Sequence, residues 1–164
     1  MEEYKNIQGY EFYSVSNFGN VRNNRTLRIL KPGVSGDGYY TINLCNGINK
    51  PISMKIHKLV GKAFIENPKN KRCIDHIDRN KLNNKVENLR WATHSENNMN
   101  KKLYSNNKTK CKGIKKRYNR YHALITIHGH TEYIGSFESF NQAVIARHTR
   151  ALELFGNYAN ETNV

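Results

Sequence analysis

The chain has few cysteines, few acidic residues and no long apolar run. Its three cysteines, Cys45, Cys73 and Cys111, are widely spaced and form no C-x-x-C pair, which argues against a disulfide framework and against a structural zinc site. No apolar stretch approaches the roughly 20 residues that a membrane-spanning helix needs. The N-terminus MEEYKN has neither the basic start nor the apolar stretch of a signal peptide. We therefore expect a protein that is neither secreted nor inserted in a membrane, in a reducing cytoplasm.

The shortage of acidic residues gives the chain a strong positive charge. Its 164 residues include 27 Lys and Arg against 13 Asp and Glu, a formal net charge of +14. The stretch between Glu96 and Glu132 contains many lysines and arginines but no acidic residue. Such an imbalance indicates a polyanion partner, and nucleic acid is the first candidate. Only 37% of the residues are hydrophobic, so we expect a modest core in one ordinary domain or in two or three small ones.

The first half of the chain reads as short strands followed by one helix. Polar and apolar residues alternate between residues 10 and 54, which predicts short antiparallel strands, with Asn46-Gly47 as a hairpin turn. Apolar residues at helical spacing from Ile56 to Phe64 then predict an amphipathic helix that stops before Asn67-Pro68.

The next segment reads as strand, loop, strand and helix. KRCIDHID and ENLRWAT are strand candidates joined by a polar loop, and we expect Trp91 in the core. Thr93 and Glu96 form a capping-box pattern that starts a helix at about His94. Residues 98–111 lack apolar periodicity and are interpreted as a linker.

The C-terminal segment has the pattern of a small α+β unit. Strands are expected at about 113–117, 121–128 and 131–137. A second capping box, Ser139 with Gln142, opens a helix that Gly156 ends. The apolar stripe of this helix, which includes Val144 and Phe155, is expected to cover one face of the sheet.

Four polar residues have the spacing of a catalytic centre. Asp75 and His76 end one strand, and Asn88 and Asn97 follow twelve and twenty-one positions after His76. Oxygen atoms of Asp and Asn suit one hard divalent cation, Mg²⁺ or Mn²⁺. A neutral imidazole beside that cation can take a proton from water, which then attacks a phosphodiester. Neighbours on a regular strand face opposite ways, so Asp75 and His76 converge only if the strand ends or bulges there.

These residues carry a family resemblance. HKLVGKAFIENP and CIDHIDRNKLNNKVENLRWATHSENNMN resemble the HNH nuclease core of phage and intron-encoded homing endonucleases, over about residues 57–100. The resemblance implies a ββα-metal fold, His76 as general base, Asp75 and Asn97 as metal ligands, and Asn88 as the catalytic-centre residue that braces the loop behind the base. The final His of the family name is Asn97 here, as in the homing-type branch.

The flanking segments resemble DNA-binding modules. YKNIQGYEFYSVSNFGNVRN resembles the nuclease-associated modular motif, with Tyr4 where that motif usually has Trp. The segment from Cys111 to Asn160 is similar to the plant ethylene-response-factor (APETALA-two) domain, whose three-stranded sheet enters the major groove; here Tyr121 stands where Trp is common. The implied division is an N-terminal segment 1–54, an HNH core 55–100, a basic linker 101–111 and a DNA-binding domain 112–160.

The basic residues and two tyrosines are the candidate DNA contacts. On a regular strand Lys115 and Arg117 share a face that Lys116 does not, so we expect one set to read bases and the other to anchor phosphates. The candidate DNA-binding residues are Arg22, Arg25, Lys101, Lys102, Lys112, Lys115, Lys116, Arg117, Arg120, Tyr121 and Tyr133.

The overall prediction is an α+β protein with a ββα-metal (HNH) core and a small three-stranded antiparallel sheet packed on one helix. Its expected function is metal-dependent, site-specific cleavage of double-stranded DNA, in the host cytoplasm if a phage or virus encodes it. One alternative is a sequence-specific DNA-binding regulator with a non-catalytic HNH scaffold, and another is a structure-specific or RNA-directed nuclease. His57, which opens the amphipathic helix without a spaced partner, is interpreted as structural or as a phosphate contact, with catalysis the minority option.

Overall fold

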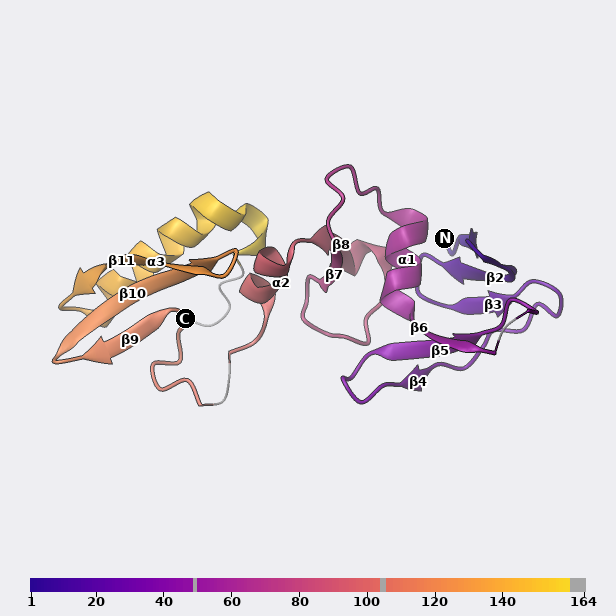
Figure 1. Cartoon of the computed structure of the whole chain (residues 1–164), viewed down its shortest axis with the longest axis horizontal. Helices are drawn as coiled ribbons and strands as arrows, with labels where there is room; N and C mark the ends of the chain where they lie inside the picture. Colours follow the sequence, from indigo (N-terminus) through magenta and orange to yellow (C-terminus); the bar gives the residue numbers. More distant parts are fainter. Residues whose placement is uncertain (49, 104–105, 160–164) are drawn as a thin grey trace. The chain divides into compact units, whose positions relative to one another are not determined.

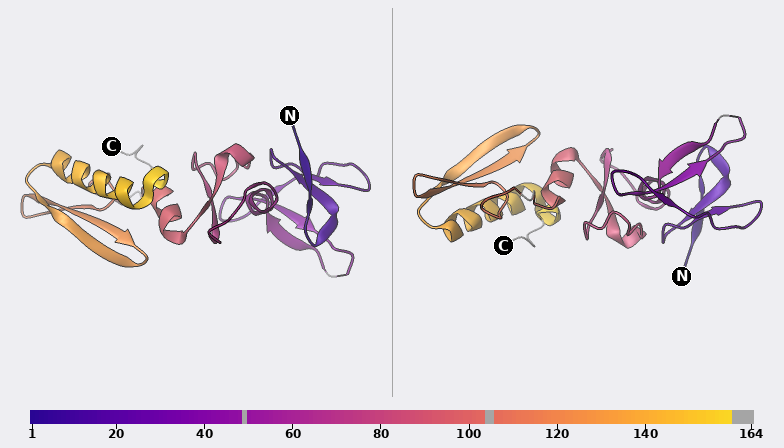
Figure 2. Two further views of the ribbon diagram at one scale, coloured as in Figure 1. Left: turned by 90° about the horizontal axis from the view of Figure 1, so that it is seen from above. Right: turned by 90° about the horizontal axis from the view of Figure 1, so that it is seen from below.

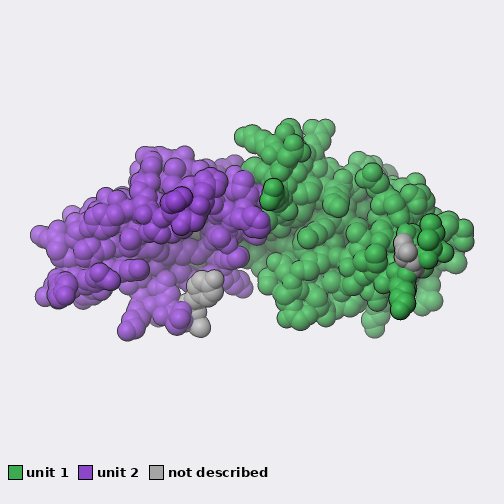
Figure 3. All heavy atoms as spheres, viewed as in Figure 1, with its two compact units in different colours: residues 1–91 green, residues 92–164 purple. Residues whose placement is uncertain are grey.

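The structure is a computed structural model that describes residues 1–48, 50–103 and 106–159. It is an α+β protein of small antiparallel sheets and few helices, as the sequence predicted (Figure 1). Its contacts divide the chain into two compact units, residues 1–91 and 92–164, which Figure 3 distinguishes by colour. None of the helices in the described ranges has the length and apolar character that crossing a membrane requires.

The first unit contains two three-stranded antiparallel sheets, which confirms the predicted short strands. The sheets follow chain order and consist of β1 (Tyr4–Ile7), β2 (Tyr10–Ser16) and β3 (Val21–Asn23), then β4 (Gly33–Val34), β5 (Tyr40–Leu44) and β6 (Ile52–Lys55). Gly47 does adopt a positive φ of 84°. The connection from Leu44 to Ile52 is longer than the two-residue turn that Asn46-Gly47 suggested.

Helix α1 (Ile56–Phe64) follows at the predicted position and packs against strands of both sheets. Its buried Leu59 and Val60 join a core made by side chains from both sheets. Gly61 lies so close to Ile74 that an added Cβ would meet Ile74 Cδ1 at 2.0 Å. The Ile74 side chain therefore fills the space that a side chain at position 61 would occupy, and a larger residue there would require Ile74 to move.

The ββα order of the predicted core is present. Strand β7 (Cys73–His76) pairs with β8 (Leu89–Ala92), and a loop containing the short 3-10 helix η1 (Val86–Asn88) joins them. Helix α2 (His94–Asn100) begins with the predicted capping box: Glu96 N donates to Thr93 Oγ1 at 3.2 Å, and Thr93 N donates to Glu96 Oε2 at 2.6 Å. Trp91 is half-buried against the core, and its indole nitrogen donates to Ile65 O at 2.9 Å.

The second unit contains a three-stranded antiparallel sheet covered on one face by a helix (Figure 2). Its elements are β9 (Ile114–Arg117), β10 (Arg120–Ile127), β11 (His130–Phe137), α3 (Phe140–Phe155) and the 3-10 helix η2 (Gly156–Tyr158). Met99 of α2 packs with Ile125, Ala151 and Phe155, so contacts group α2 with this sheet. The module boundaries inferred from the sequence stay a prediction.

The start of α3 differs from the sequence prediction. Ser139 is the N-cap, but its side chain makes no capping hydrogen bond, so the Ser139–Gln142 capping box is wrong. Ser139, Asn141 and Gln142 are exposed, and water can satisfy the first amide groups of the helix instead. At the other end Gly156 is the C-cap with a φ of 48°, as predicted.

Candidate functional site

Asp75 and His76 lie at the end of β7, which meets the condition that the strand must end where they converge. Both side chains are buried, with 4% and 5% of their surface exposed. Asp75 Oδ2 accepts a hydrogen bond from Arg90 Nε of the neighbouring strand β8 at 2.9 Å, and Arg90 Nη2 forms an ion pair with the same oxygen at 2.9 Å. A buried carboxylate requires such compensation of its charge. Arg90 was missed from the sequence because its partner is fifteen positions away.

Asn84 fixes the protonation of the His76 ring. His76 Nε2 lies 3.2 Å from Asn84 Oδ1. An amide oxygen can only accept a hydrogen bond, so Nε2 carries the proton and Nδ1 of the neutral ring carries the lone pair. Burial lowers the pKa of His76 below its ordinary value, against the effect of the Asn84 hydrogen bond. The ring is therefore neutral at pH 7, with Nδ1 as the atom able to take a proton.

Asn88 binds the loop between β7 and β8 from within. Its Nδ2 donates to Asp78 Oδ1 at 2.9 Å and to Asn83 O at 2.8 Å, and its Oδ1 accepts from Asp78 N at 3.0 Å. Ile77 N also donates to Asn88 O at 2.9 Å. Both ends of the loop that carries Asn84 are thus tied to one buried amide side chain.

The N-terminal sheets hold the same loop from outside. Val86 N donates to Asn17 O at 2.8 Å. Gly19, with a φ of 87°, lies against Asn84 so closely that a Cβ would come within 2.8 Å of the Asn84 Cβ. Lys81 Nζ donates to Asp37 O at 2.8 Å. The N-terminal segment therefore supports the loop that carries Asn84.

Asn97 lies in the first turn of α2, where its backbone N donates to Thr93 O at 3.0 Å. It belongs to the second unit, whereas Asp75 belongs to the first. The described ranges contain no cluster of three or more His, Cys, Asp or Glu side chains suited to a metal ion. The ligand pair of Asp75 and Asn97, one carboxylate and one amide, stays a prediction.

His57 is closer to the centre than its sequence position suggested. It lies in the first turn of α1, only 4% exposed, and its ring centroid is 5.0 Å from that of His76 and 4.7 Å from that of Tyr39. Burial, helped by the positive charges of nearby groups, lowers the pKa of His57 to about 3, so the ring is neutral. Neither His57 nor Tyr39 has a sequence spacing that reveals this neighbourhood.

The candidate DNA contacts of the C-terminal sheet separate onto two faces. Lys115 and Arg117 line a shallow cleft with His122, Leu124 and Tyr133 on the face away from α3. The other face is occupied by different candidates. Lys116 Nζ lies 5.5 Å from the centre of the Tyr121 ring, and this ring packs edge-on against Phe140 of α3.

The remaining candidates are engaged within the protein to different degrees. Lys112 Nζ donates to Met99 O at 2.7 Å and also bonds Lys101 O, so it caps the C-terminus of α2. Arg120 Nε donates to Ser136 Oγ at 2.8 Å. Arg22 and Arg25 lie over the rings of Tyr4 and Phe12, 4.2 and 3.7 Å from their centres. Lys101 and Lys102 line a pocket after α2 together with Asn98 and Leu103.

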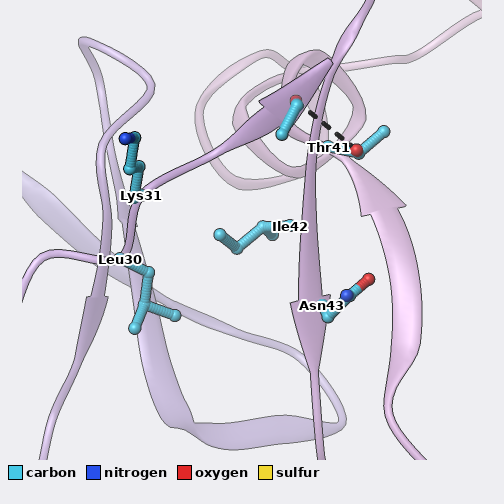
Figure 4. A pocket seen from close by; sticks show the side chains of 6 residues that line it. Leu30, Lys31, Thr41, Ile42 and Asn43 are labelled. Atoms are coloured by element: carbon cyan, nitrogen blue, oxygen red, sulfur yellow. Dashed lines mark hydrogen bonds between the residues drawn. The ribbon is translucent and has the colours of Figure 1, made fainter. Parts of the chain in front are cut away.

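A further pocket lies between the N-terminal strands (Figure 4). Leu30, Lys31, Thr41, Ile42 and Asn43 line it, and Thr41 Oγ1 donates to Gly33 O at 3.5 Å. Its lining contains no acid, histidine or cysteine.

The strand pair, the buried Asp-His pair and the capped helix define the class of ββα nucleases, and comparison with known proteins agrees. Residues 65–99 match the family described as HNH endonuclease, and residues 2–45 match the NUMOD4 motif. A solved structure reported as "DNA binding and cleavage by the HNH homing endonuclease I-HmuI" is 30% identical, with a TM-score of 0.57 over 94% of this chain and 83% of its own. The chain therefore belongs to the HNH endonuclease family.

Two curated relatives are also described as endonucleases. The sequence is 45% identical over 93 residues to an uncharacterised HNH endonuclease, L247, of Acanthamoeba polyphaga mimivirus, a match covering 56% of this chain and 23% of the relative. It is 41% identical over 96 residues to the DNA endonuclease I-HmuI of Bacillus phage SP01, covering 58% of this chain and 55% of that one. The matches thus span about a quarter and about half of these relatives' lengths.

Proposed function

We propose that this chain is a metal-dependent DNA endonuclease of the homing type that hydrolyses a phosphodiester in double-stranded DNA. The observation that carries the proposal is the state of His76: buried at a strand end beside Asp75, neutral, and with Nδ1 as its basic atom. Family membership and the similarity to a homing endonuclease support the same reaction.

In the proposed reaction His76 Nδ1 takes a proton from the water that attacks the phosphorus in line with the leaving 3′ oxygen. Asn84 and Asn88 keep the ring and its loop in place while the proton moves. Asp75 and Asn97 provide carboxylate and amide oxygens, donors that suit Mg²⁺ or Mn²⁺. When bound, the cation would stabilise the negative charge that develops on the phosphate and the leaving oxygen.

A plasmid-nicking assay tests the function directly. The full chain is incubated with supercoiled plasmid carrying a random-site library, in Mg²⁺, in Mn²⁺ and in excess chelator, and the ends are mapped. We expect cleavage that requires the cation and recurs at a preferred sequence. Binding without cleavage in either metal would instead favour the DNA-binding regulator, and cleavage without preference for a duplex sequence would favour a structure-specific or RNA-directed nuclease.

Asp75→Asn and Asn97→Ala should both weaken metal dependence. Asn is used at position 75 because its amide oxygen can still accept the hydrogen bond from Arg90 Nε, which alanine would lose. We expect each variant to need a higher metal concentration for half-maximal cleavage, with partial recovery in Mn²⁺. An unchanged metal titration in both variants would contradict the ligand assignment.

Asn88→Ala should act through the loop instead. Its amide makes three hydrogen bonds that close residues 78–88, so its loss frees the segment that carries Asn84. Loss of such supporting contacts typically costs on the order of 10- to 100-fold in activity. The cleavage rate should fall while the metal titration midpoint remains unchanged. A large shift of that midpoint would mean that Asn88 contacts the cation directly.

A further inference from the structure

Three aromatic rings from three different elements meet at the proposed base. Tyr39 comes from the turn before β5, His57 from the first turn of α1, and His76 from the end of β7. The rings of His57 and His76 lie 5.0 Å apart with an angle of 71° between their planes. Tyr39 lies 4.7 Å from His57 and 5.8 Å from His76. All three separations fall in the range of aromatic contacts, and the His57–His76 pair has the edge-to-face arrangement that such rings favour.

Two lysines lie close to the Tyr39 ring. Lys55 Nζ and Lys81 Nζ lie 4.4 and 4.7 Å from the centre of its ring. Lys55 also pairs with the carboxylate of Asp37, and Lys81 donates to Asp37 O at 2.8 Å. The Tyr39 ring is therefore in contact with a lysine of β6 and with a lysine of the loop that follows His76.

The His57 side chain contacts its neighbours through its ring and not through a hydrogen bond of its buried nitrogen. Its Nδ1 is buried and makes no hydrogen bond with any described residue. A phenylalanine can therefore replace it without leaving another group unpaired, since removing an unsatisfied polar atom is neutral or favourable. A charged ring here would instead repel the imidazolium that His76 becomes when it takes a proton.

We propose that Tyr39 and His57 are positioning residues that hold the imidazole of His76 in one orientation. This inference rests on the proposed function, in which His76 is the general base. Asn84 bonds the Nε2 atom of the imidazole. The contacts with the rings of His57 and Tyr39 restrict the tilt of the imidazole as a whole. The N-terminal segment thereby contributes to the chemistry through Tyr39 as well as to any DNA contact.

The kinetic test compares His57→Ala, which removes the ring, with His57→Phe, which keeps the ring and removes the nitrogens. Two quantities are measured for each variant. The first is the single-turnover rate of cleavage at saturating metal, and the second is the Kd for DNA. We expect His57→Ala to lower the rate by about 10- to 100-fold, the cost of a misplaced catalytic group, with an unchanged Kd. His57→Phe should restore most of that rate. Tyr39→Ala should resemble His57→Ala, and Tyr39→Phe should resemble wild type.

Tyr40→Ala is the matched control for lost packing. Tyr40 is the next residue of the chain and packs against the N-terminal core, so its truncation lowers stability by a similar mechanism. We expect the cleavage rate of its folded fraction to match wild type. A loss in Tyr40→Ala equal to that in His57→Ala would overturn the proposal, because loosening of the core would explain both.

A second measurement does not depend on cleavage. In the metal-free full chain, the carbon-bound ring protons of His76 are observed by NMR. Wild type and His57→Phe should each give one sharp set of signals with contacts to the neighbouring ring, and His57→Ala should give broadened or averaged signals. Unchanged His76 signals in His57→Ala would overturn the proposal, as would a His57→Phe variant that is as inactive as His57→Ala with an ordered His76. If wild type does not cleave DNA, the proposed function fails while the NMR comparison still decides the role of His57.

Discussion

His76→Ala abolishes DNA cleavage and leaves DNA affinity nearly unchanged; this is the expected result with the largest effect. General base catalysis contributes about 10²- to 10⁴-fold to a rate, and alanine removes the base completely. The side chain is 5% exposed, so it offers little surface for holding DNA. Single-turnover cleavage and a binding titration in Ca²⁺ separate the two properties.

His130→Ala is the control, because His130 is exposed at the start of β11 and far along the chain from the proposed centre. It should cleave like wild type. The mechanism is wrong if His76→Ala cuts at near the wild-type rate. A His76→Ala variant that neither binds nor cleaves DNA would instead point to a loss of folding, which circular dichroism checks.

The elements around His76 could be predicted because their signals are local. Apolar periodicity identified α1, and the Thr93–Glu96 pair identified the start of α2, since both depend on residues within one or two turns. The same reasoning was wrong at Ser139, where the residue types of a capping box are present but the side chain does not bond. The residue types of a capping box allow a side-chain cap but do not require one, because water can also bond the first amide groups of an exposed helix end.

The partners of the catalytic residues could not be predicted, because tertiary contacts create them. Arg90 reaches Asp75 across a strand pair, and Asn84 reaches His76 through a loop whose path depends on Asn88 and on the N-terminal sheet. His57 and Tyr39 meet only because α1 and the turn before β5 pack together. The spacing of these residues along the chain does not predict such contacts.

Charge composition had a similar limit. The excess of lysine and arginine indicated a polyanion partner but could not say which cations the protein uses internally. Lys112 donates to carbonyl oxygens at the end of α2, and Lys116 lies over Tyr121 on the side of the sheet that faces α3. Lys115 and Arg117 are exposed and line the cleft on the other face. The two faces of the C-terminal sheet can therefore be compared by substituting the basic residues of each face separately.

The open face of the C-terminal sheet is where we expect the second large effect. Lys115→Ala combined with Arg117→Ala removes two exposed cations from one face of β9, and Lys116→Ala removes one from the opposite face. By counterion release, each lost phosphate contact flattens the slope of log affinity against log salt by about 0.9. If either residue reads a base, its loss costs a further ~1–3 kcal/mol and relaxes specificity at that position.

We therefore expect the double variant to bind DNA at least about tenfold more weakly at physiological salt, with a slope flatter by up to ~2, and to cut at a less restricted set of sites. Lys116→Ala should change the slope and the site preference little, although the variants share the same strand. Point variants are preferred to removal of the whole sheet, because Met99 of α2 packs against Ile125 and Phe155 and truncation would expose that core. Equal losses in Lys116→Ala and in the double variant would show that the net charge of β9, and not its open face, governs DNA binding.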